Sequence, residues 1–360
     1  MCCWEYLLSE ENVWSERVCT KVFLSVFEPA TLAELQDAVL SAPRVICVGA
    51  GTKPRLSAVE GVRISTRRLV GMVEYDPAEF TFTALAGTPL SEIVAVLAEQ
   101  GQHLPFDPVL VEAGSTLGGA VAAGLSGPGR FRFGGVRDFL LGVQCVDGLG
   151  RLLRLGGKVV KNAAGFDVPK FLVGSLGRFA AIGAVTFKVF PRPAATRSLS
   201  LSNRPGLLER LAAGRWNVDA IDIPPGGQRV LVRLVGPEEA LKPLAADLLR
   251  ALSAGEDAAE VAAEFWNDLR EFRWALPHGV LVKSAITLGQ VGDFAAGHVS
   301  CGGNVAYTSV ATPAELPAHL VGLTLAGNAP LWVGGRPRYA VEAAVKQAFD
   351  PDHRFPSLDD

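Results

Sequence analysis

Residues 158–177 read Lys-Val-Val-Lys-Asn-Ala-Ala-Gly-Phe-Asp-Val-Pro-Lys-Phe-Leu-Val-Gly-Ser-Leu-Gly. The first half of this stretch combines two lysines and an amide with small residues, and the second half contains two closely spaced glycines. Glycine is concentrated around it, because 18 of the chain's 39 glycines lie between Gly101 and Gly183. Glycine lets the backbone turn tightly and approach another group closely. The stretch and its surroundings therefore predict loops that lie against a ligand.

Two further glycine-rich stretches lie upstream. Residues 49–53 read Gly-Ala-Gly-Thr-Lys directly after a β-branched run, and residues 114–124 read Gly-Ser-Thr-Leu-Gly-Gly-Ala-Val-Ala-Ala-Gly. Backbone N–H groups in such turns, often at a helix N-terminus, hold the pyrophosphate of a dinucleotide. Neither stretch is a Rossmann or P-loop motif, because Pro54 replaces the last fingerprint glycine and no GxxxxGK[ST] occurs. Taken alone, a glycine cluster is more often a plain turn than a cofactor loop.

The order and spacing of four motifs are more specific. Ser115-Thr-Leu-Gly-Gly119, Val136-Arg-Asp-Phe-Leu-Leu-Gly142, the loop at 161–167 and Gly174-Ser-Leu-Gly177 follow one another along the chain. Over about residues 22–193 the sequence resembles the FAD-binding domain shared by relatives of vanillyl-alcohol oxidase and p-cresol methylhydroxylase (PCMH). Within that superfamily it resembles the family of FAD-binding E subunits of glycolate oxidase, through residues 87–90, 101–105, 124–128 and 189–193.

This resemblance implies FAD as the cofactor. By it, the backbones of residues 49–53 and 115–119 hold the pyrophosphate, and later segments line the rest of the groove. The cofactor-binding residues that it implies are Gly49, Ala50, Gly51, Thr52, Lys53, Pro105, Ser115, Thr116, Leu117, Gly118, Gly119, Gly124, Arg137, Leu141, Gly142, Lys161, Asn162, Gly165, Asp167 and Ile182. Covalent relatives attach the flavin through histidine or cysteine in or beside these loops. Residues 49–53 and 114–119 contain neither, so we expect non-covalent FAD.

Some residues depart from the family pattern or allow two interpretations. Phe166 stands where tyrosine is usual, and Arg178 follows Gly177 where a small or uncharged residue is commoner. Lys161 would either favour an anionic reduced flavin or contact a phosphate or solvent. His103 would be a base or a flavin attachment point, or, as histidines more often are, a structural residue in a turn.

The sequence pattern predicts an α+β fold of two lobes. A capping box at Thr31 starts a helix, a second helix follows Thr88-Pro89, and strands are expected at 80–84, 139–146, 151–155 and 184–190. Beyond Pro193 the order becomes strand, helix, strand, strand, helix, which suits an antiparallel sheet backed by helices. We therefore expect an N-terminal tail at 1–21, a PCMH-type FAD-binding domain at 22–193, and a smaller α+β cap-like domain with an antiparallel sheet at 194–360.

Composition excludes several classes of partner. The net charge of -3 offers no footprint for nucleic acid, and no apolar run reaches the roughly 18 residues of a membrane span. The six cysteines form no CxxC pair, the five histidines lack ligand-like spacing, and residues 296–304 are interpreted as a loop, so no metal site is expected.

The resemblance implies an oxidoreductase acting on the CH–OH group of 2-hydroxy acids. We expect the FAD-binding subunit of a multisubunit glycolate or D-lactate dehydrogenase, with a catalytic flavoprotein subunit and an iron–sulfur subunit as partners. Such a chain would work in the cytoplasm, or at the inner face of the membrane through those partners. The alternatives are a stand-alone FAD-dependent hydroxy-acid dehydrogenase and an FAD-stabilised assembly subunit. No catalytic residue is identified, because Arg336 and Arg338 are candidate carboxylate clamps without a base beside them.

Overall fold

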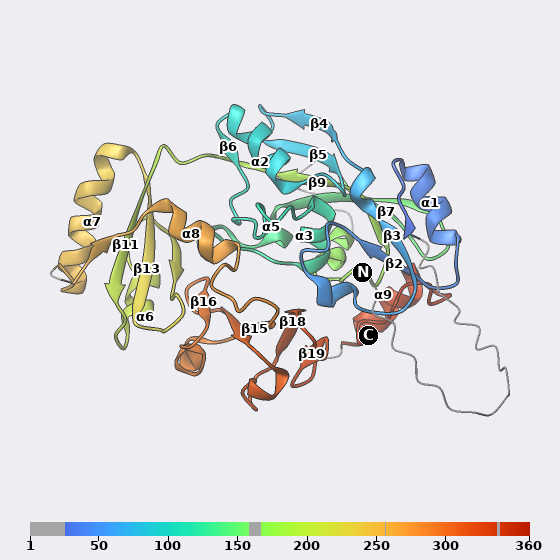
Figure 1. Cartoon of the computed structure of the whole chain (residues 1–360). Coiled ribbons are helices and arrows are strands. Elements are labelled where there is room, and N and C mark those ends of the chain that lie inside the picture. Colours follow the sequence, from blue (N-terminus) through green and yellow to red (C-terminus); the bar gives the residue numbers. More distant parts are fainter. Residues whose placement is uncertain (1–25, 158–166, 256, 337–338) are drawn as a thin grey trace, which may run out of the picture.

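The computed structural model describes residues 26–157, 167–255, 257–336 and 339–360. The proposed tail at 1–21 therefore lies outside the described residues. The chain forms two lobes, of which the first carries the blue and green elements of Figure 1 and the second the yellow and orange ones. Within the described residues no helix is both long and apolar enough to cross a membrane.

Two sheets build the first lobe. A three-stranded parallel sheet has the order β1-β3-β2, and a five-stranded antiparallel sheet has the order β4-β5-β9-β7-β8. The short pair β6 and β10 lies at the exit from this lobe. The strands are β1 Val26–Phe27, β2 Val45–Val48, β3 Val62–Ser65, β4 Met72–Asp76, β5 Thr81–Leu85, β6 Gln102–His103, β7 Leu140–Val146, β8 Leu152–Gly156, β9 Ala181–Lys188 and β10 Phe190–Pro191.

Helices start where the local chemistry allows it. The Thr31 hydroxyl accepts from Glu34 N at 3.1 Å, and the Glu34 carboxylate accepts from Ala30 N, so the predicted capping box begins α1. In this lobe the helices are α1 Leu32–Leu40, α2 Leu90–Glu99, α3 Leu117–Ala123, α4 Arg130–Phe133 and α5 Val136–Phe139. Leu90, Ile93 and Leu97 of α2 are fully buried against the five-stranded sheet. The helices and strands predicted for this lobe are confirmed to within a few residues.

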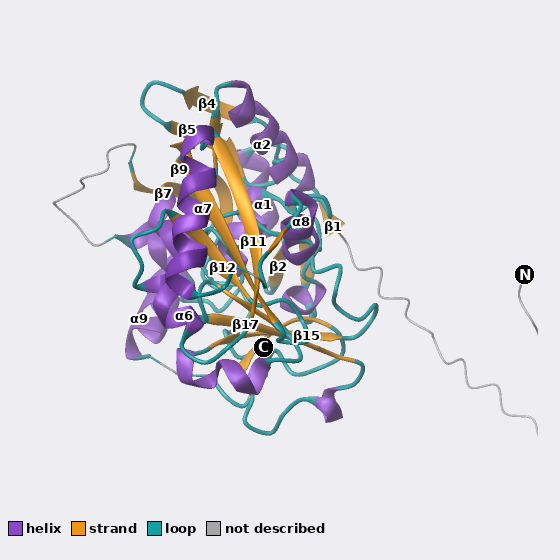
Figure 2. Ribbon diagram, turned by 90° about the vertical axis from the view of Figure 1, so that its left-hand side faces the viewer, coloured by secondary structure: helices purple, strands orange, loops and turns teal. Residues whose placement is uncertain are grey.

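Two antiparallel sheets build the second lobe. One has the order β12-β13-β11-β14, and α7 packs on its face (Figure 2); the other has the order β16-β17-β15-β18-β19. The elements are β11 Ala195–Ser202, α6 Leu207–Ala212, β12 Val218–Asp222, β13 Arg229–Gly236, α7 Glu238–Leu252, β14 Ala259–Glu260, α8 Ala263–Arg270, β15 Val280–Ala285, β16 His298–Ser300, β17 Val305–Val310, β18 Gly322–Ala326, β19 Trp332–Val333 and α9 Ala340–Phe349. The α+β class with antiparallel sheets beyond the first lobe is confirmed.

Two local expectations were wrong. Residues 298–300 form strand β16, because Val299 and its neighbours pair with β17, so the stretch at 296–304 is not simply a loop. His103 lies in strand β6 rather than in a turn, and its Nδ1 lies 3.2 Å from the carbonyl oxygen of Phe190.

An apolar cluster joins the lobes. Leu110, Leu125 and Leu176 of the first lobe pack with Tyr307 and Leu325 of the second. Helix α9, red in Figure 1, and the residues after it then return to the first lobe, where the N–H of Gly148 donates to the carbonyl oxygen of Phe349 at 2.8 Å. Short 3-10 turns complete the structure, at Pro54–Ser57, Thr66–Arg68, Val168–Leu172, Leu288–Phe294 and Pro313–Glu315.

Candidate functional site

The loop at residues 49–53 leaves strand β2 with its backbone donors free. Within the described residues, no hydrogen bond is made by the main-chain N–H groups of this loop. Gly51 has a φ of 77° and no atom within 4 Å of where a Cβ would stand, so it requires glycine and faces open space. Arg67 donates to the carbonyl oxygen of Ala50 at 2.7 Å and fixes the loop from outside. The loop is thus held in place with its N–H groups available to an anion.

The start of helix α3 packs directly against this loop. A Cβ on Gly49 would lie 2.4 Å from the hydroxyl oxygen of Thr116, so only glycine allows the contact. The Thr116 hydroxyl caps α3 by accepting from Gly119 N at 3.3 Å. The N–H groups of Leu117 and Gly118 donate to the carbonyl oxygens of Thr88 and Ala86. Residues 115–119 therefore contribute hydroxyls and a smooth glycine surface to the site, while the main-chain N–H groups of residues 115, 117, 118 and 119 bond within the fold.

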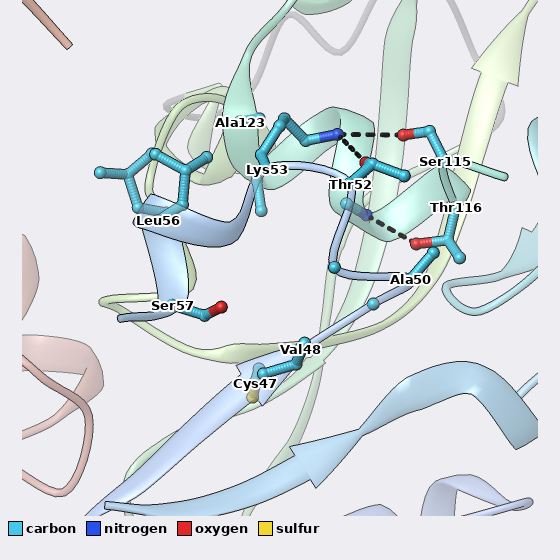
Figure 3. Close-up of a pocket in the computed structure, with 15 residues that line it drawn as sticks. Cys47, Val48, Ala50, Thr52, Lys53, Leu56, Ser57, Ser115, Thr116 and Ala123 are labelled. Atoms are coloured by element: carbon cyan, nitrogen blue, oxygen red, sulfur yellow. Dashed lines mark hydrogen bonds between the residues drawn. The ribbon is translucent and has the colours of Figure 1, made fainter. Parts of the chain in front are cut away.

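Lys53 is a buried cation between the two loops. Only 8% of the residue is exposed, and its Nζ donates to Thr52 Oγ1 at 2.9 Å and to Ser115 Oγ at 3.0 Å (Figure 3). Within the described residues, no carboxylate forms an ion pair with it. Burial lowers the pKa of Lys53 to about 8, because desolvation disfavours the ammonium. Within the described residues, the partners of the Lys53 ammonium are therefore neutral hydroxyls rather than anions.

Two adjoining pockets, together called the loop pocket, lie around these groups. One is lined by the loop itself with Leu56, Ser115, Thr116 and Ala123, and the other reaches Gly118, Gly177 and Ile182. Cys47, Gly49, Gly119 and Leu176 border both. Burial raises the pKa of the Cys47 thiol to about 12.

The structure brings part of the predicted site together. Among the predicted residues, those that line the loop pocket are Gly49, Ala50, Gly51, Thr52, Lys53, Ser115, Thr116, Gly118, Gly119 and Ile182. Leu117 is fully buried beneath them in the core. Lys161, Asn162 and Gly165 lie outside the described residues.

Other predicted residues lie away from the loop pocket. Gly124 ends α3 in the left-handed conformation, and Arg137, Leu141 and Gly142 belong to α5 and β7. Asp167 pairs with Lys170 at 2.6 Å. Pro105 lines a separate cavity of about 480 Å³ between the lobes.

Sequence reasoning missed residues at the loop pocket and at the junction between the lobes. Leu176 and Gly177 belong to the Gly174–Gly177 motif, but only the three-dimensional fold shows that they line the loop pocket. Lys283 of β15 gave no sequence signal, although its Nζ reaches the carbonyl oxygen of Gly124 across the lobe junction at 3.4 Å. Burial, together with the charge of nearby Arg130, lowers the pKa of Lys283 to about 8. In the described part of the chain, no group of three or more His, Cys, Asp or Glu side chains could hold a metal ion.

Comparisons with known proteins identify the family and the fold that the chain resembles. Residues 23–156 match the family model described as an FAD binding domain, which confirms the expected cofactor. Glycolate oxidase subunit GlcE of Escherichia coli K12 is 37% identical over 252 residues, covering 68% of this chain and 69% of that protein. Glycolate oxidase subunit GlcD of Bacillus subtilis is 27% identical over 139 residues, covering 39% of this chain and 29% of that protein. In fold, the chain is similar to alkyldihydroxyacetonephosphate synthase, with a TM-score of 0.61 and 18% identity over 78% of this chain and 66% of that one.

Proposed function

The chain belongs to the FAD-binding family that includes the glycolate oxidase subunit GlcE, and from this premise we propose that it is the FAD-binding subunit of a glycolate or D-lactate dehydrogenase. The FAD pyrophosphate is assigned to the loop pocket. The observation that carries this assignment is the buried Lys53 ammonium, whose two partners are neutral hydroxyls. A buried cation without an anionic partner is costly, and a pyrophosphate would supply the missing charge.

The residues present fit the cofactor. The free N–H groups of residues 49–53 would donate to the phosphate oxygens, as would Lys53 and the Ser115 hydroxyl. Gly51 leaves room for a ligand to approach the backbone, because nothing lies within 4 Å of where its Cβ would stand. When bound, FAD would supply an isoalloxazine ring that takes up and releases electrons during the oxidation of a 2-hydroxy acid by the complex.

We further propose that the chain works with a catalytic flavoprotein subunit and an iron–sulfur subunit. The support is that two relatives, GlcE and GlcD, are both described as glycolate oxidase subunits. Such an assembly would operate in the cytoplasm, or at the inner face of the membrane through its other subunits. The proposed division into an FAD-binding lobe at 22–193 and a cap-like region from 194 is supported by the separate core that residues 199–329 contribute.

The proposal is tested by measuring the flavin content of the purified chain and its selectivity between FAD and FMN. We expect the purified chain to carry FAD at about one per chain, or to take it up when FAD is added. FMN, which lacks the pyrophosphate, should bind more weakly. A chain that retains no flavin and does not bind added FAD would contradict the proposal.

A further inference from the structure

Residues 350–360 return to the first lobe and pack into its core. Phe355 is 1% exposed and packs with Leu35, Val45 and Ile64. Val45 N donates to the carbonyl oxygen of Arg354 at 2.9 Å, which holds this segment at the start of β2. Arg354 itself donates to the carbonyl oxygens of Gly148 and Ala42 at 2.9 and 2.5 Å. The segment is therefore part of the lobe that contains the loop pocket.

Arg178, one of the two residues that depart from the family pattern, lies fully buried where this segment meets the loop pocket. It is 1% exposed, and its Nη2 donates to the carbonyl oxygen of Leu56 at 2.9 Å and to that of Asp360 at 3.2 Å. Among the described residues, its Nε has no hydrogen-bond partner, and the negative charge of Asp360 favours the charged guanidinium. Burial lowers the pKa of Arg178 to about 10, so the guanidinium stays charged at neutral pH.

Leu56 connects Arg178 to the buried lysine. Its N–H donates to the carbonyl oxygen of Lys53 at 3.1 Å, its carbonyl accepts from Arg178, and the residue lines the loop pocket. Arg178 also follows Leu176 and Gly177 directly, and both of these border the pocket. The guanidinium of Arg178 thus joins the turn after the 49–53 loop to the returning segment, and its backbone continues from a second wall of the pocket.

We propose that Arg178 is a positioning residue for FAD: it holds the turn at Leu56, and with it the 49–53 loop, in the conformation that binds the pyrophosphate. This inference rests on the proposed function. Burying a guanidinium costs more than burying an apolar side chain of similar volume, even with the charge of Asp360 nearby. The cost is explained if the hydrogen bonds fix a loop that must present its donors before the ligand arrives, because preorganisation reduces the entropy lost on binding.

The chain offers a matched control for the test. Arg178 and Arg354 each tie residues 350–360 to the first lobe through main-chain carbonyls, but only Arg178 reaches the turn beside the loop pocket. We expect FAD to dissociate from Arg178→Met holoprotein at least ten times faster than from the wild type. Arg354→Met should lower the melting temperature while its FAD dissociation rate stays within threefold of the wild type.

The measurement is the recovery of flavin fluorescence after dilution of the holoprotein, with the melting temperature of each variant recorded alongside. Arg178→Lys provides a second variant, since lysine keeps the charge but cannot bridge both carbonyls, and we expect an intermediate rate. Equal rates in the wild type and in Arg178→Lys or Arg178→Met would overturn the inference, as would equal acceleration by Arg354→Met. A wild-type chain that holds no FAD would instead count against the proposed function.

Discussion

The ammonium nitrogen of Lys53 lies 3.0 Å from the hydroxyl oxygen of Ser115, and this contact joins two loops that are 62 residues apart in the sequence. The hydroxyl accepts the hydrogen bond but carries no charge. Desolvation of the ammonium is therefore only partly compensated, which is why the pKa of Lys53 falls to about 8. An anion that binds beside the ammonium offsets this free-energy cost of burying its charge.

The first prediction concerns FAD affinity and pH. Lys53→Met should raise the Kd for FAD about 10- to 100-fold at pH 7, the expected value of a hydrogen bond to a charged group. Binding of an anion favours the ammonium and raises its pKa above 8. The wild-type Kd should therefore be flat below pH 8 and increase above it, by at most about tenfold per pH unit. Titration of the apoprotein with FAD from about pH 6.5 to about pH 9.5, a range that brackets the pKa of Lys53, measures both effects.

The Lys53→Met variant is also the control for this pH dependence. Its Kd should not change between pH 7 and 9 beyond the change caused by the flavin itself. Parallel curves for the variant and the wild type would show that another group titrates in the site.

The second prediction is that the same substitution stabilises the protein when FAD is absent. Between about pH 8 and the usual lysine pKa near 10.4, the unfolded chain binds a proton that the folded chain has released, so wild-type stability should rise with pH in this window. Below pH 8 Lys53 is charged in the folded state, so the folded state bears the full free-energy cost of burying the ammonium. Apoprotein of Lys53→Met should therefore be more stable at pH 7 by about 1–3 kcal/mol, and the advantage should shrink by pH 9.5. Denaturant unfolding at the two pH values would refute the argument if the wild type were the more stable at pH 7.

The third prediction separates two neighbouring glycines. A Cβ on Gly118 would lie 2.7 Å from Ala86 Cβ and 3.0 Å from its carbonyl oxygen, whereas a Cβ on Gly119 would meet only its own cap, Thr116 Oγ1, at 3.0 Å. Gly118→Ala should lower the free energy of unfolding by about 1–3 kcal/mol through overpacking. Gly119→Asp should fold but lose FAD, because its carboxylate enters the loop pocket and repels the pyrophosphate. Flavin content and melting temperature of the two variants test this; a Gly119→Asp protein that is full of FAD would show that the pyrophosphate lies elsewhere.

Sequence reasoning identified the two glycine-rich loops, but not which of their N–H groups remain free and which bond within the fold. The glycines of residues 49–53 and 114–119 could be identified because turns and close backbone approach leave few other residues possible. Which N–H groups remain free depends on long-range partners, such as the carbonyl oxygen of Ala86 that accepts from Gly118. The role of Arg178 was hidden for the same reason, since the Leu56 carbonyl that it holds lies 122 residues away. Contacts at such separation are set by topology, which local patterns do not specify.

The fourth prediction is that FAD is held without a covalent bond. Cys47 borders the loop pocket and is the nearest candidate for attachment, but burial raises the pKa of its thiol to about 12. A thiol that remains protonated at neutral pH is a poor nucleophile. Acid precipitation of the holoprotein should leave the yellow flavin in the supernatant, and Cys47→Ser should give the same result. Flavin in the wild-type pellet that moves to the supernatant in Cys47→Ser would contradict the prediction.

The last prediction is that this chain alone, loaded with FAD, does not oxidise glycolate or D-lactate at a useful rate. A 2-hydroxy acid needs a cation for its carboxylate, a base for its hydroxyl proton and a C–H bond aimed at the flavin. Arg336, one of the two candidate clamps, is engaged by Glu342 and Asp359, and Arg338 lies outside the described residues. His298 is 2% exposed and is held by Asp222 at 2.7 Å, so it faces the core rather than an accessible site.

Electrons are therefore expected to pass to or from this flavin through partner subunits. The decisive measurement is anaerobic stopped-flow mixing of the FAD-loaded chain with each acid, compared with the same experiment on the complete complex. The absorbance of oxidised flavin at about 450 nm should persist in the isolated chain and be lost in the complex. Rapid bleaching of the isolated chain would make it a complete dehydrogenase, and the groups at the lobe junction around Lys283 would then be the place to seek its substrate site.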